Sequence, residues 1–221
     1  MIMAFYDNIP KVTRNLLLIN IIFFVATLVA EDFMVGTFAM FYPASPYFRF
    51  WQPLTHMFMH GGFWHIFFNM YSLWMFGSIV ERALGEKKFL TFYFICGFGA
   101  AALHTGVEYL TATSYLAAGN TAAYTQLLYT PVLGASGAVY GLLIGFAMLY
   151  PDARLTLIFP PISLGAKWWA GIFIAIELLT GITGTAMGIA HFAHLGGALF
   201  GFLLIFFWRK SHRIWDKDKW I

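Results

Sequence analysis

Three short polar motifs, each at the start of a strongly apolar stretch, contain the residues best suited to chemistry. They are the segments 65–69 (His-Ile-Phe-Phe-Asn), 134–137 (Gly-Ala-Ser-Gly) and 194–197 (His-Leu-Gly-Gly). Polar and ionisable side chains are costly inside a bilayer, so those found in membrane-spanning segments usually serve a function. A serine, a histidine and an asparagine are side chains that acyl-transfer chemistry uses.

The chemistry that these residue types permit is nucleophilic attack by serine. A serine hydroxyl is a weak nucleophile and needs a base within hydrogen-bonding distance. His194 is the candidate base for Ser136, because an imidazole can take the proton and return it to the leaving amine. The developing oxyanion also needs donors, and removal of one such donor typically lowers the rate by about 100- to 1,000-fold. We expect these donors to be Asn69, His65 on the same helix face, and backbone amides of the first helical turn near Ser136.

Two glycine stripes predict a close approach between the serine-bearing and histidine-bearing segments. Within each stripe the glycines are four residues apart: Gly137, Gly141 and Gly145 in one, Gly197 and Gly201 in the other. Small residues at this spacing let membrane helices approach closely. Taken alone, the glycines favour simple packing. Their position beside Ser136 and His194 favours a catalytic pair, since the two side chains need close backbones to hydrogen-bond.

The acidic residues of the sequence do not suggest a third member of this pair. Glu31 and Asp32 lie in a different outer loop, and Glu177 lies in the middle of the fifth apolar stretch. We therefore predict a Ser–His dyad rather than a triad. Tyr140, one turn after the serine, is expected to pack against the ring of His194 and hold it.

The composition predicts a protein that crosses the membrane several times. The chain of 221 residues is 60% hydrophobic and 10% charged, with a mean hydropathy of +0.72. A soluble domain of this length does not bury so much apolar surface. We expect the first apolar stretch to be kept as a span rather than cleaved as a signal peptide, and the whole chain, residues 1–221, to form a single transmembrane domain. The six expected spans are 14–30, 63–81, 88–109, 132–150, 168–187 and 189–208.

The lysines and arginines predict the orientation of the spans. Of the 13 basic residues, 12 fall on one side and only Arg49 falls on the other. By the positive-inside rule, both termini are expected to be cytoplasmic. The second, fourth and sixth spans then enter from outside, so that His65, Ser136 and His194 lie at a similar depth. This basic fringe explains the net charge of +3, and we expect no nucleic-acid partner.

Two segments between the spans are expected on the outer side. Residues 33–62 are apolar and aromatic but contain three prolines. They cannot span as a helix, because broken helices leave backbone groups unsatisfied in lipid. We expect this segment to lie in the membrane interface beside the helices. Residues 111–130 are uncharged and rich in alanine and threonine, and we expect a long outer loop there.

The motifs together resemble the rhomboid family of intramembrane serine proteases, over nearly the whole chain. The resemblance implies an all-α fold: a six-transmembrane-helix rhomboid-type bundle of the bacterial form, with a membrane-associated first outer loop. It rests on Gly-x-Ser-Gly at 134–137, His-x-x-x-Asn at 65–69 with the earlier His60, Ala-His-x-x-Gly-x-x-x-Gly at 193–201, and Glu81, Gly85, Phe89 and Tyr93.

The resemblance also implies roles for individual residues. Ser136 would be the nucleophile and His194 the base. Asn69, His65 and the amide of Ser136 would stabilise the oxyanion, and Tyr140 would stack on the ring of the base. No cofactor and no metal is implied.

The resemblance also assigns supporting roles to two residues outside the proposed reaction. Gly134 belongs to the serine motif, and Glu81 would be a structural hydrogen-bonding residue. The chain departs from the family pattern at one place: Trp51 is followed by Gln52, where many bacterial relatives carry arginine. The anchoring of the first outer loop therefore does not follow from the resemblance.

The family implies substrates that are themselves transmembrane proteins, cut near the outer end of their helix where small or helix-breaking residues let the strand unfold. The partners would be these substrates and the lipid bilayer. The resemblance to the bacterial form also predicts an integral protein of a bacterial inner membrane.

Three other functions fit parts of the sequence. Zinc could be held by His56, His60, His65, His191 and His194, although no carboxylate or cysteine accompanies them and His-Glu-x-x-His is absent. A rhomboid-fold adaptor without catalysis would not need both the serine and the histidine. A transporter could use Glu177 as a proton relay, although a protonated Glu177 bonded to a neighbouring helix explains this residue more simply.

Overall fold

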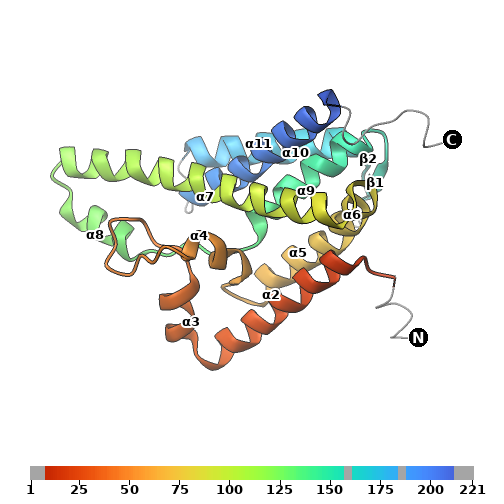
Figure 1. The fold of residues 1–221 in the computed structure, drawn as a ribbon. Helices are drawn as coiled ribbons and strands as arrows, with labels where there is room; N and C mark the ends of the chain where they lie inside the picture. Colours follow the sequence, from red (N-terminus) through yellow and green to blue (C-terminus); the bar gives the residue numbers. More distant parts are fainter. Residues whose placement is uncertain (1–7, 157–160, 184–187, 212–221) are drawn as a thin grey trace.

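The computed structural model describes residues 8–156, 161–183 and 188–211, and most of these are helical (Figure 1). Residues Leu73–Gly77 form a π-helical turn, and residues His56–Phe58 form a 3₁₀ turn. Strands β1 (Arg154–Thr156) and β2 (Ser163–Gly165) pair antiparallel. The predicted all-α class is confirmed. The helices are α2 (Lys11–Val29), α3 (Glu31–Phe38), α4 (Gln52–Thr55), α5 (Phe63–Ser72), α6 (Ser78–Leu84), α7 (Glu86–Ala117), α8 (Thr121–Tyr129), α9 (Ser136–Leu149), α10 (Ala166–Thr183) and α11 (Gly188–Lys210).

Four of the expected spans correspond to single helices. Within the described residues, the helices long and apolar enough to cross a membrane are Lys11–Val29, Glu86–Ala117, Ala166–Thr183 and Ala190–Lys210. The expected spans 63–81 and 132–150 correspond to the α5–α6 run and to α9, an apolar helix of 14 residues. The total of six spans stays a prediction. The end of the fifth expected span, 184–187, and the basic residues within 212–221 lie outside the described residues.

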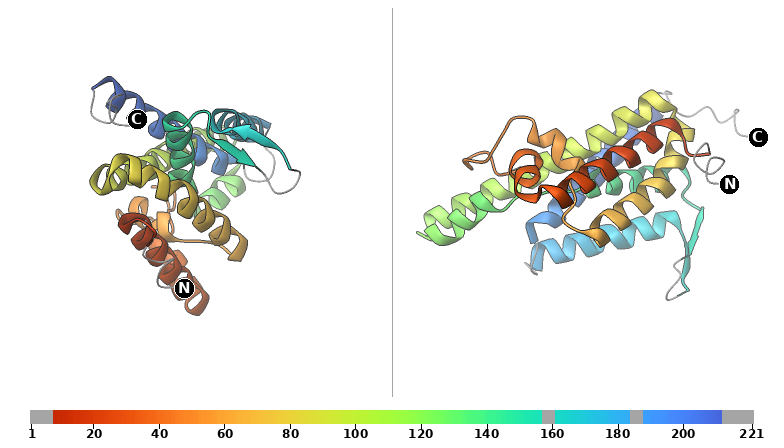
Figure 2. Two further views of the ribbon diagram at one scale, coloured as in Figure 1. Left: turned by 90° about the vertical axis from the view of Figure 1, so that its right-hand side faces the viewer. Right: turned by 90° about the horizontal axis from the view of Figure 1, so that it is seen from below.

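The helices alternate in direction, so that α5, α9 and α11 begin at one end of the bundle. That end also holds α3, α4 and α8, whereas α2 begins and α11 ends at the opposite end (Figure 1). The β1–β2 pair extends from this opposite end, between α9 and α10 (Figure 2). The three motifs therefore share one end of the bundle. Ser136 is the first residue of α9, and His65, Asn69 and His194 lie within the first two turns of their helices, as predicted.

Helices α9 and α11 meet backbone to backbone along the two glycine stripes. A Cβ atom on Gly197 would collide with the carbonyl of Gly137, and one on Gly201 would lie 2.9 Å from the Cα of Gly141. Contacts this close leave no room for any side chain larger than hydrogen. The predicted close approach of these two helices is confirmed.

The opposite end of the bundle is fastened by Glu81 of α6. Its side chain is buried, and its two oxygens accept hydrogen bonds from the amides of Val12 (2.9 Å) and Thr13 (2.7 Å) and from the Thr13 hydroxyl (2.7 Å). The first amides of a helix have no partner within the helix, so a carboxylate there satisfies them and caps α2. The predicted structural role of Glu81 is confirmed.

The segment 33–62, which is the predicted first outer loop, is held together by Gln52, the residue at which the chain departs from the family pattern. Its buried side chain accepts hydrogen bonds from the amides of Arg49 (3.0 Å) and Phe41 (3.4 Å) and donates one to the carbonyl of Tyr47 (2.9 Å). An amide side chain both donates and accepts, so a single glutamine ties three points of the loop.

The expectation of a long outer loop over 111–130 is wrong, because most of this segment is helical. Helix α7 continues to Ala117, which makes it 32 residues or about 48 Å long, and its last turns project beyond α10 and α11 (Figures 1 and 2). Asn120 then caps α8 by accepting a hydrogen bond from the amide of Ala123 (3.1 Å). A small apolar cluster packs the two helices against the first outer loop: Tyr42, Ala112 and Leu127.

Candidate active site

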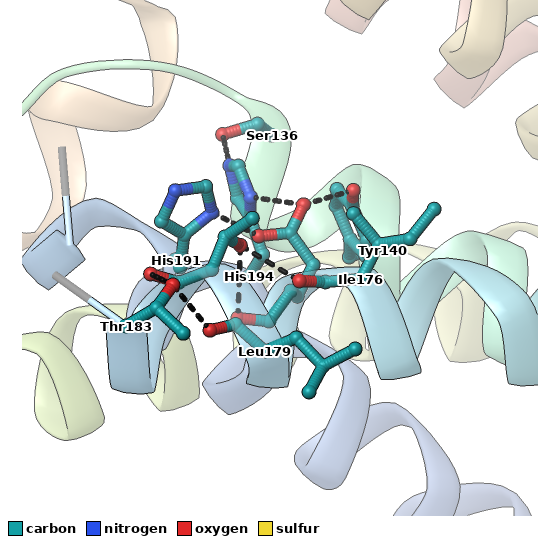
Figure 3. A network of polar contacts seen from close by, with 9 residues as sticks. Ser136, Tyr140, Ile176, Leu179, Thr183, His191 and His194 are labelled. Carbon is teal, nitrogen blue, oxygen red and sulfur yellow. Dashed lines mark hydrogen bonds and ion pairs between the residues drawn. The ribbon is translucent and has the colours of Figure 1, made fainter. Parts of the chain in front are cut away.

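Ser136 and His194 are hydrogen-bonded at the end of the bundle where α9 and α11 begin. The Ser136 Oγ lies 2.8 Å from the His194 Nε2, and Figure 3 shows the hydroxyl directly against the imidazole ring. The glycine contact between the two helices brings these residues together across 58 positions of sequence. Their separation is within the range that proton transfer from serine to histidine requires.

The turn before α9 fixes the position of the serine. The Gly134 amide donates to the carbonyl of His56 (2.9 Å), and Gly134 has φ +136°, a conformation that other L-residues rarely adopt. A Cβ at this position would also lie 2.9 Å from the Nε2 of His65. Glycine therefore permits the close approach of the chain to His65. The turn leaves Ser136 in the first turn of α9, where backbone amides have no partner within the helix.

The ring of Tyr140 lies flat against the ring of His194. The ring centroids are 4.5 Å apart and the planes differ by 7°. Tyr140 is one turn after Ser136, so a single helix presents both the hydroxyl and the surface that supports the imidazole. The predicted packing of Tyr140 against His194 is confirmed.

A cavity of about 350 Å³ opens beside the serine. Asn69 and His65 both line it, which brings the two predicted side-chain donors to the same space as Ser136. The side chain of Asn69 is 5% exposed, and its Nδ2 donates to the carbonyl of His65 (2.9 Å). An amide NH₂ has two hydrogens, so one remains for another acceptor. The full lining is Trp64, His65, Phe68, Asn69, Ser72, Ser136, Val139 and Tyr140.

Histidines of the first outer loop stand behind His65. Burial lowers the pKa of His56 to about 4. Burial, together with the neighbouring His65, lowers the pKa of His60 to about 3. Both rings are therefore neutral at pH 7. The ring centroids of His60 and His65 are 5.1 Å apart, and the Nδ1 of His65 accepts a hydrogen bond from the amide of Gly61 (3.4 Å). A neutral His65 that accepts at Nδ1 carries its proton on Nε2, the atom near Gly134.

The expectation that no acidic residue reaches the serine–histidine pair is wrong. An oxygen of Glu177 on α10 lies 3.0 Å from the Nδ1 of His194. This is an ion-pair distance, although the alignment of the two groups departs from that of a linear hydrogen bond. The same carboxylate accepts a hydrogen bond from the Tyr140 hydroxyl, and its other oxygen lies 2.6 Å from the Nδ1 of His191. His191 thus contacts the same carboxylate as His194.

These contacts also bear on the zinc alternative. Within the described residues, one group of possible ligands is close enough to share an ion: Glu177, His191 and His194, with ligand atoms within 4.8 Å of one another. The histidines of the first outer loop and His65 are not part of that group. The five-histidine set considered from the sequence is therefore not assembled at one place.

The fold and this site define a helical integral membrane protein in which a serine and a histidine are hydrogen-bonded beside a cavity. Residues 47–211 match the Rhomboid domain, which is more than half of the chain. The chain belongs to the rhomboid family.

Relatives of this chain come from both mitochondria and bacteria. It is 33% identical over 151 residues to the mitochondrial presenilin-associated rhomboid-like protein of Bos taurus (67% of this chain, 35% of the relative). It is 29% identical over 153 residues to the mitochondrial rhomboid protein 1 of Saccharomyces cerevisiae (66% and 38%). It is 31% identical over 163 residues to the rhomboid protease AarA of Providencia stuartii (70% and 54%). The matched regions cover only about a third to a half of these relatives, and the bacterial inner membrane stays a prediction.

Proposed function

We propose that this chain is an intramembrane serine endopeptidase that cuts transmembrane-helix substrates near the outer face of the membrane. The observation that carries the proposal is the 2.8 Å contact between Ser136 Oγ and His194 Nε2 beside a cavity that Asn69 and His65 line. The family match and the similarity to a bacterial rhomboid protease support it.

In the proposed reaction, the Ser136 oxygen attacks the carbonyl carbon of the scissile bond while its proton moves to the Nε2 of His194. The carbonyl oxygen becomes an oxyanion and accepts hydrogen bonds from Asn69, His65 and the Ser136 amide. The C–N bond then breaks, and His194 gives its proton to the leaving amine. Water then attacks the acyl-serine ester while its proton moves to His194; the ester C–O bond breaks, the carboxylic acid product leaves, and His194 returns the proton to the Ser136 oxygen.

The proposed reaction requires a substrate that can unfold locally at the bond that is cut. A peptide bond inside a helix is shielded by its own hydrogen bonds and by neighbouring side chains, so the scissile segment must become extended before it reaches Ser136. Small or helix-breaking residues lower the free energy needed for this change. We infer that the partners are transmembrane proteins, presented from the bilayer with the cut site at the end of the bundle where α5, α9 and α11 begin. With both termini cytoplasmic, this end faces outward.

Purified protein in liposomes, mixed with a fluorogenic transmembrane peptide that carries small residues near one end, tests the proposal. We expect cleavage by the parent and none by Ser136→Ala, with no effect of a zinc chelator on the parent. Cleavage that persists in Ser136→Ala would contradict the proposal, and loss with the chelator would favour a metal-dependent hydrolase. A folded parent that neither cleaves nor reacts with a fluorophosphonate would favour a membrane adaptor without catalysis.

A further inference from the structure

Glu177 is a buried carboxylate in the middle of an apolar helix, and all of its side-chain contacts described above are with the candidate active site. The side chain is 8% exposed. It contacts the Tyr140 hydroxyl on α9 and the two histidines of α11, of which His194 is the one bonded to Ser136. Figure 3 shows the side chains of Tyr140, His191 and His194 gathered close together, with Ser136 beyond the His194 ring.

We propose that Glu177 is a positioning residue that completes a Ser136–His194–Glu177 triad. The inference rests on the proposed function and adds a third group to it. Glu177 holds the His194 imidazole in the tautomer that can accept the serine proton, and it stabilises the positive ring that forms when the proton arrives.

The tautomer argument follows from the two ring nitrogens. A neutral imidazole carries one proton, and the nitrogen that lacks it is the acceptor. His194 can act as a base only if Nε2, the atom 2.8 Å from Ser136 Oγ, is free. A carboxylate oxygen 3.0 Å from Nδ1 favours the proton on Nδ1 and so leaves Nε2 free. Without the carboxylate, the opposite tautomer competes, donates to the serine oxygen and cannot take its proton.

The proton balance needs no transfer to Glu177. As the bond from Ser136 oxygen to the carbonyl carbon forms, the serine proton moves to Nε2, and His194 becomes an imidazolium with protons on both nitrogens. The Glu177 oxygen, 3.0 Å from Nδ1, offsets the new positive charge without taking a proton. When the C–N bond breaks, the Nε2 proton leaves with the amine and the neutral ring returns.

The other two contacts orient the carboxylate itself. The Tyr140 hydroxyl donates to the oxygen that faces His194, and the Nδ1 of His191 lies 2.6 Å from the second oxygen. Both oxygens are thereby fixed, and the one near His194 is held from the side by the same tyrosine that stacks on the ring. A purely structural link between the helices would need only these contacts of Glu177. A catalytic triad also requires the negative charge of its carboxylate.

The test compares Glu177→Gln with a control that removes a buried carboxylate elsewhere. Glutamine keeps the size of the side chain and removes the charge. Glu108→Gln is the matched control, because Glu108 is also buried (5% exposed) and lies 3.4 Å from a histidine, His104, within α7. We measure kcat and KM for a fluorogenic transmembrane peptide, the rate of fluorophosphonate labelling, and thermal unfolding for each full-length variant.

We expect Glu177→Gln to lower kcat by about 100-fold or more, as removal of a triad carboxylate does elsewhere, with KM changed by less than about threefold. Fluorophosphonate labelling should slow in parallel, because that reaction needs the same base. Glu108→Gln should leave kcat and the labelling rate at the parental values. Glu177→Asp, which restores the charge one methylene farther away, should recover at least about a tenth of the parental kcat.

The outcomes separate this inference from the proposed function. If Ser136→Ala is inactive but folded Glu177→Gln keeps kcat within about threefold of the parent, the triad is wrong and the protease stands. If Ser136→Ala still cleaves, the protease itself is wrong. If Glu177→Gln does not fold, the test rests on Glu177→Asp. A folded Glu177→Asp protein with a kcat below about a tenth of the parental value would overturn the role of the charge.

Discussion

Two buried glutamates fasten opposite ends of the bundle, and their partners differ in kind. Glu81, 3% exposed, accepts hydrogen bonds from the backbone amides of Val12 and Thr13 and from the Thr13 hydroxyl. None of these donors changes its protonation state near neutral pH. The contacts of Glu81 therefore cap α2 and hold it to α6, and they involve no group that exchanges protons near neutral pH.

Glu177 is buried to a similar degree but faces groups that gain and lose protons. Two of its partners are histidines, and one of them is bonded to a serine beside a cavity. The comparison teaches that burial alone does not distinguish a structural carboxylate from a functional one. The protonation chemistry of the partners does, and it predicts that substitutions at the two ends affect different properties: activity at one end and stability at the other.

The largest expected effect is at the serine–histidine pair. Ser136→Ala and His194→Ala should each lower cleavage by at least about 1,000-fold, because the nucleophile and its base act as a unit. Ser136→Ala should unfold at the parental temperature, since it leaves the capping of α2 by Glu81 and the contacts of Glu177 untouched. Cleavage of a fluorogenic transmembrane peptide and thermal unfolding in detergent provide the two readouts. Appreciable turnover by either variant would contradict the claim that substitutions at this end of the bundle abolish activity.

The next effect concerns oxyanion stabilisation. Asn69→Ala should lower kcat by about 100-fold with little change in KM, because an oxyanion donor acts mainly in the transition state. Steady-state kinetics with the same peptide measures both constants. A variant that keeps kcat but loses affinity would show that Asn69 orients the substrate instead.

His191→Ala sharpens the comparison within the site. His191 contacts the second oxygen of Glu177 but not Ser136, and without it the oxygen that faces His194 still accepts the hydrogen bond from Tyr140. We therefore expect kcat to fall by less than about fivefold, against the much larger loss in His194→Ala. Fluorophosphonate labelling of His191→Ala should match that of the parent. Inactivity of His191→Ala together with labelling of His194→Ala would exchange the roles of the two histidines.

The smallest expected effect on activity is at the opposite end. Glu81→Ala leaves the partly buried amide of Val12 and the buried donors of Thr13 without their acceptor, which should lower the free energy of unfolding by about 1–3 kcal/mol. The kcat per folded molecule should stay at the parental value. Glu81→Gln, which keeps one acceptor oxygen, should be destabilised less. A large fall in kcat with unchanged stability would contradict the structural role of Glu81.

Much of the site could be predicted from the sequence, because its parts follow from local spacing. The glycine stripes indicated which helix faces approach, and the basic residues indicated which spans run together. The contact between Ser136 and His194 and the stacking of Tyr140 on His194 follow from these two signals. The role of Glu81 was also predicted, from the family pattern, and it has the expected hydrogen bonds.

The contacts of Glu177 could not be predicted in this way, because they depend on the rotation of α10 about its axis. In lipid, outward-facing residues such as Ile172, Ile176 and Leu179 are as apolar as inward-facing ones, so hydropathy does not identify the inner face. One available signal was the carboxylate itself, since an ionisable group in an apolar helix requires a partner. The helical conformation of 111–130 was missed because the segment was interpreted as a loop from its lack of charge and its alanine and threonine content, although alanine is the strongest helix former.

The measurement that tests the central claim most directly is the mass of the intact protein after treatment with a fluorophosphonate. The account predicts one adduct per molecule, located at Ser136 by peptide mapping, in the parent and in Glu81→Ala. It predicts no adduct in Ser136→Ala or in folded His194→Ala, because the serine without its base stays a neutral alcohol. A parent that cleaves a transmembrane peptide without acquiring an adduct, or that acquires it at another residue, would contradict the account.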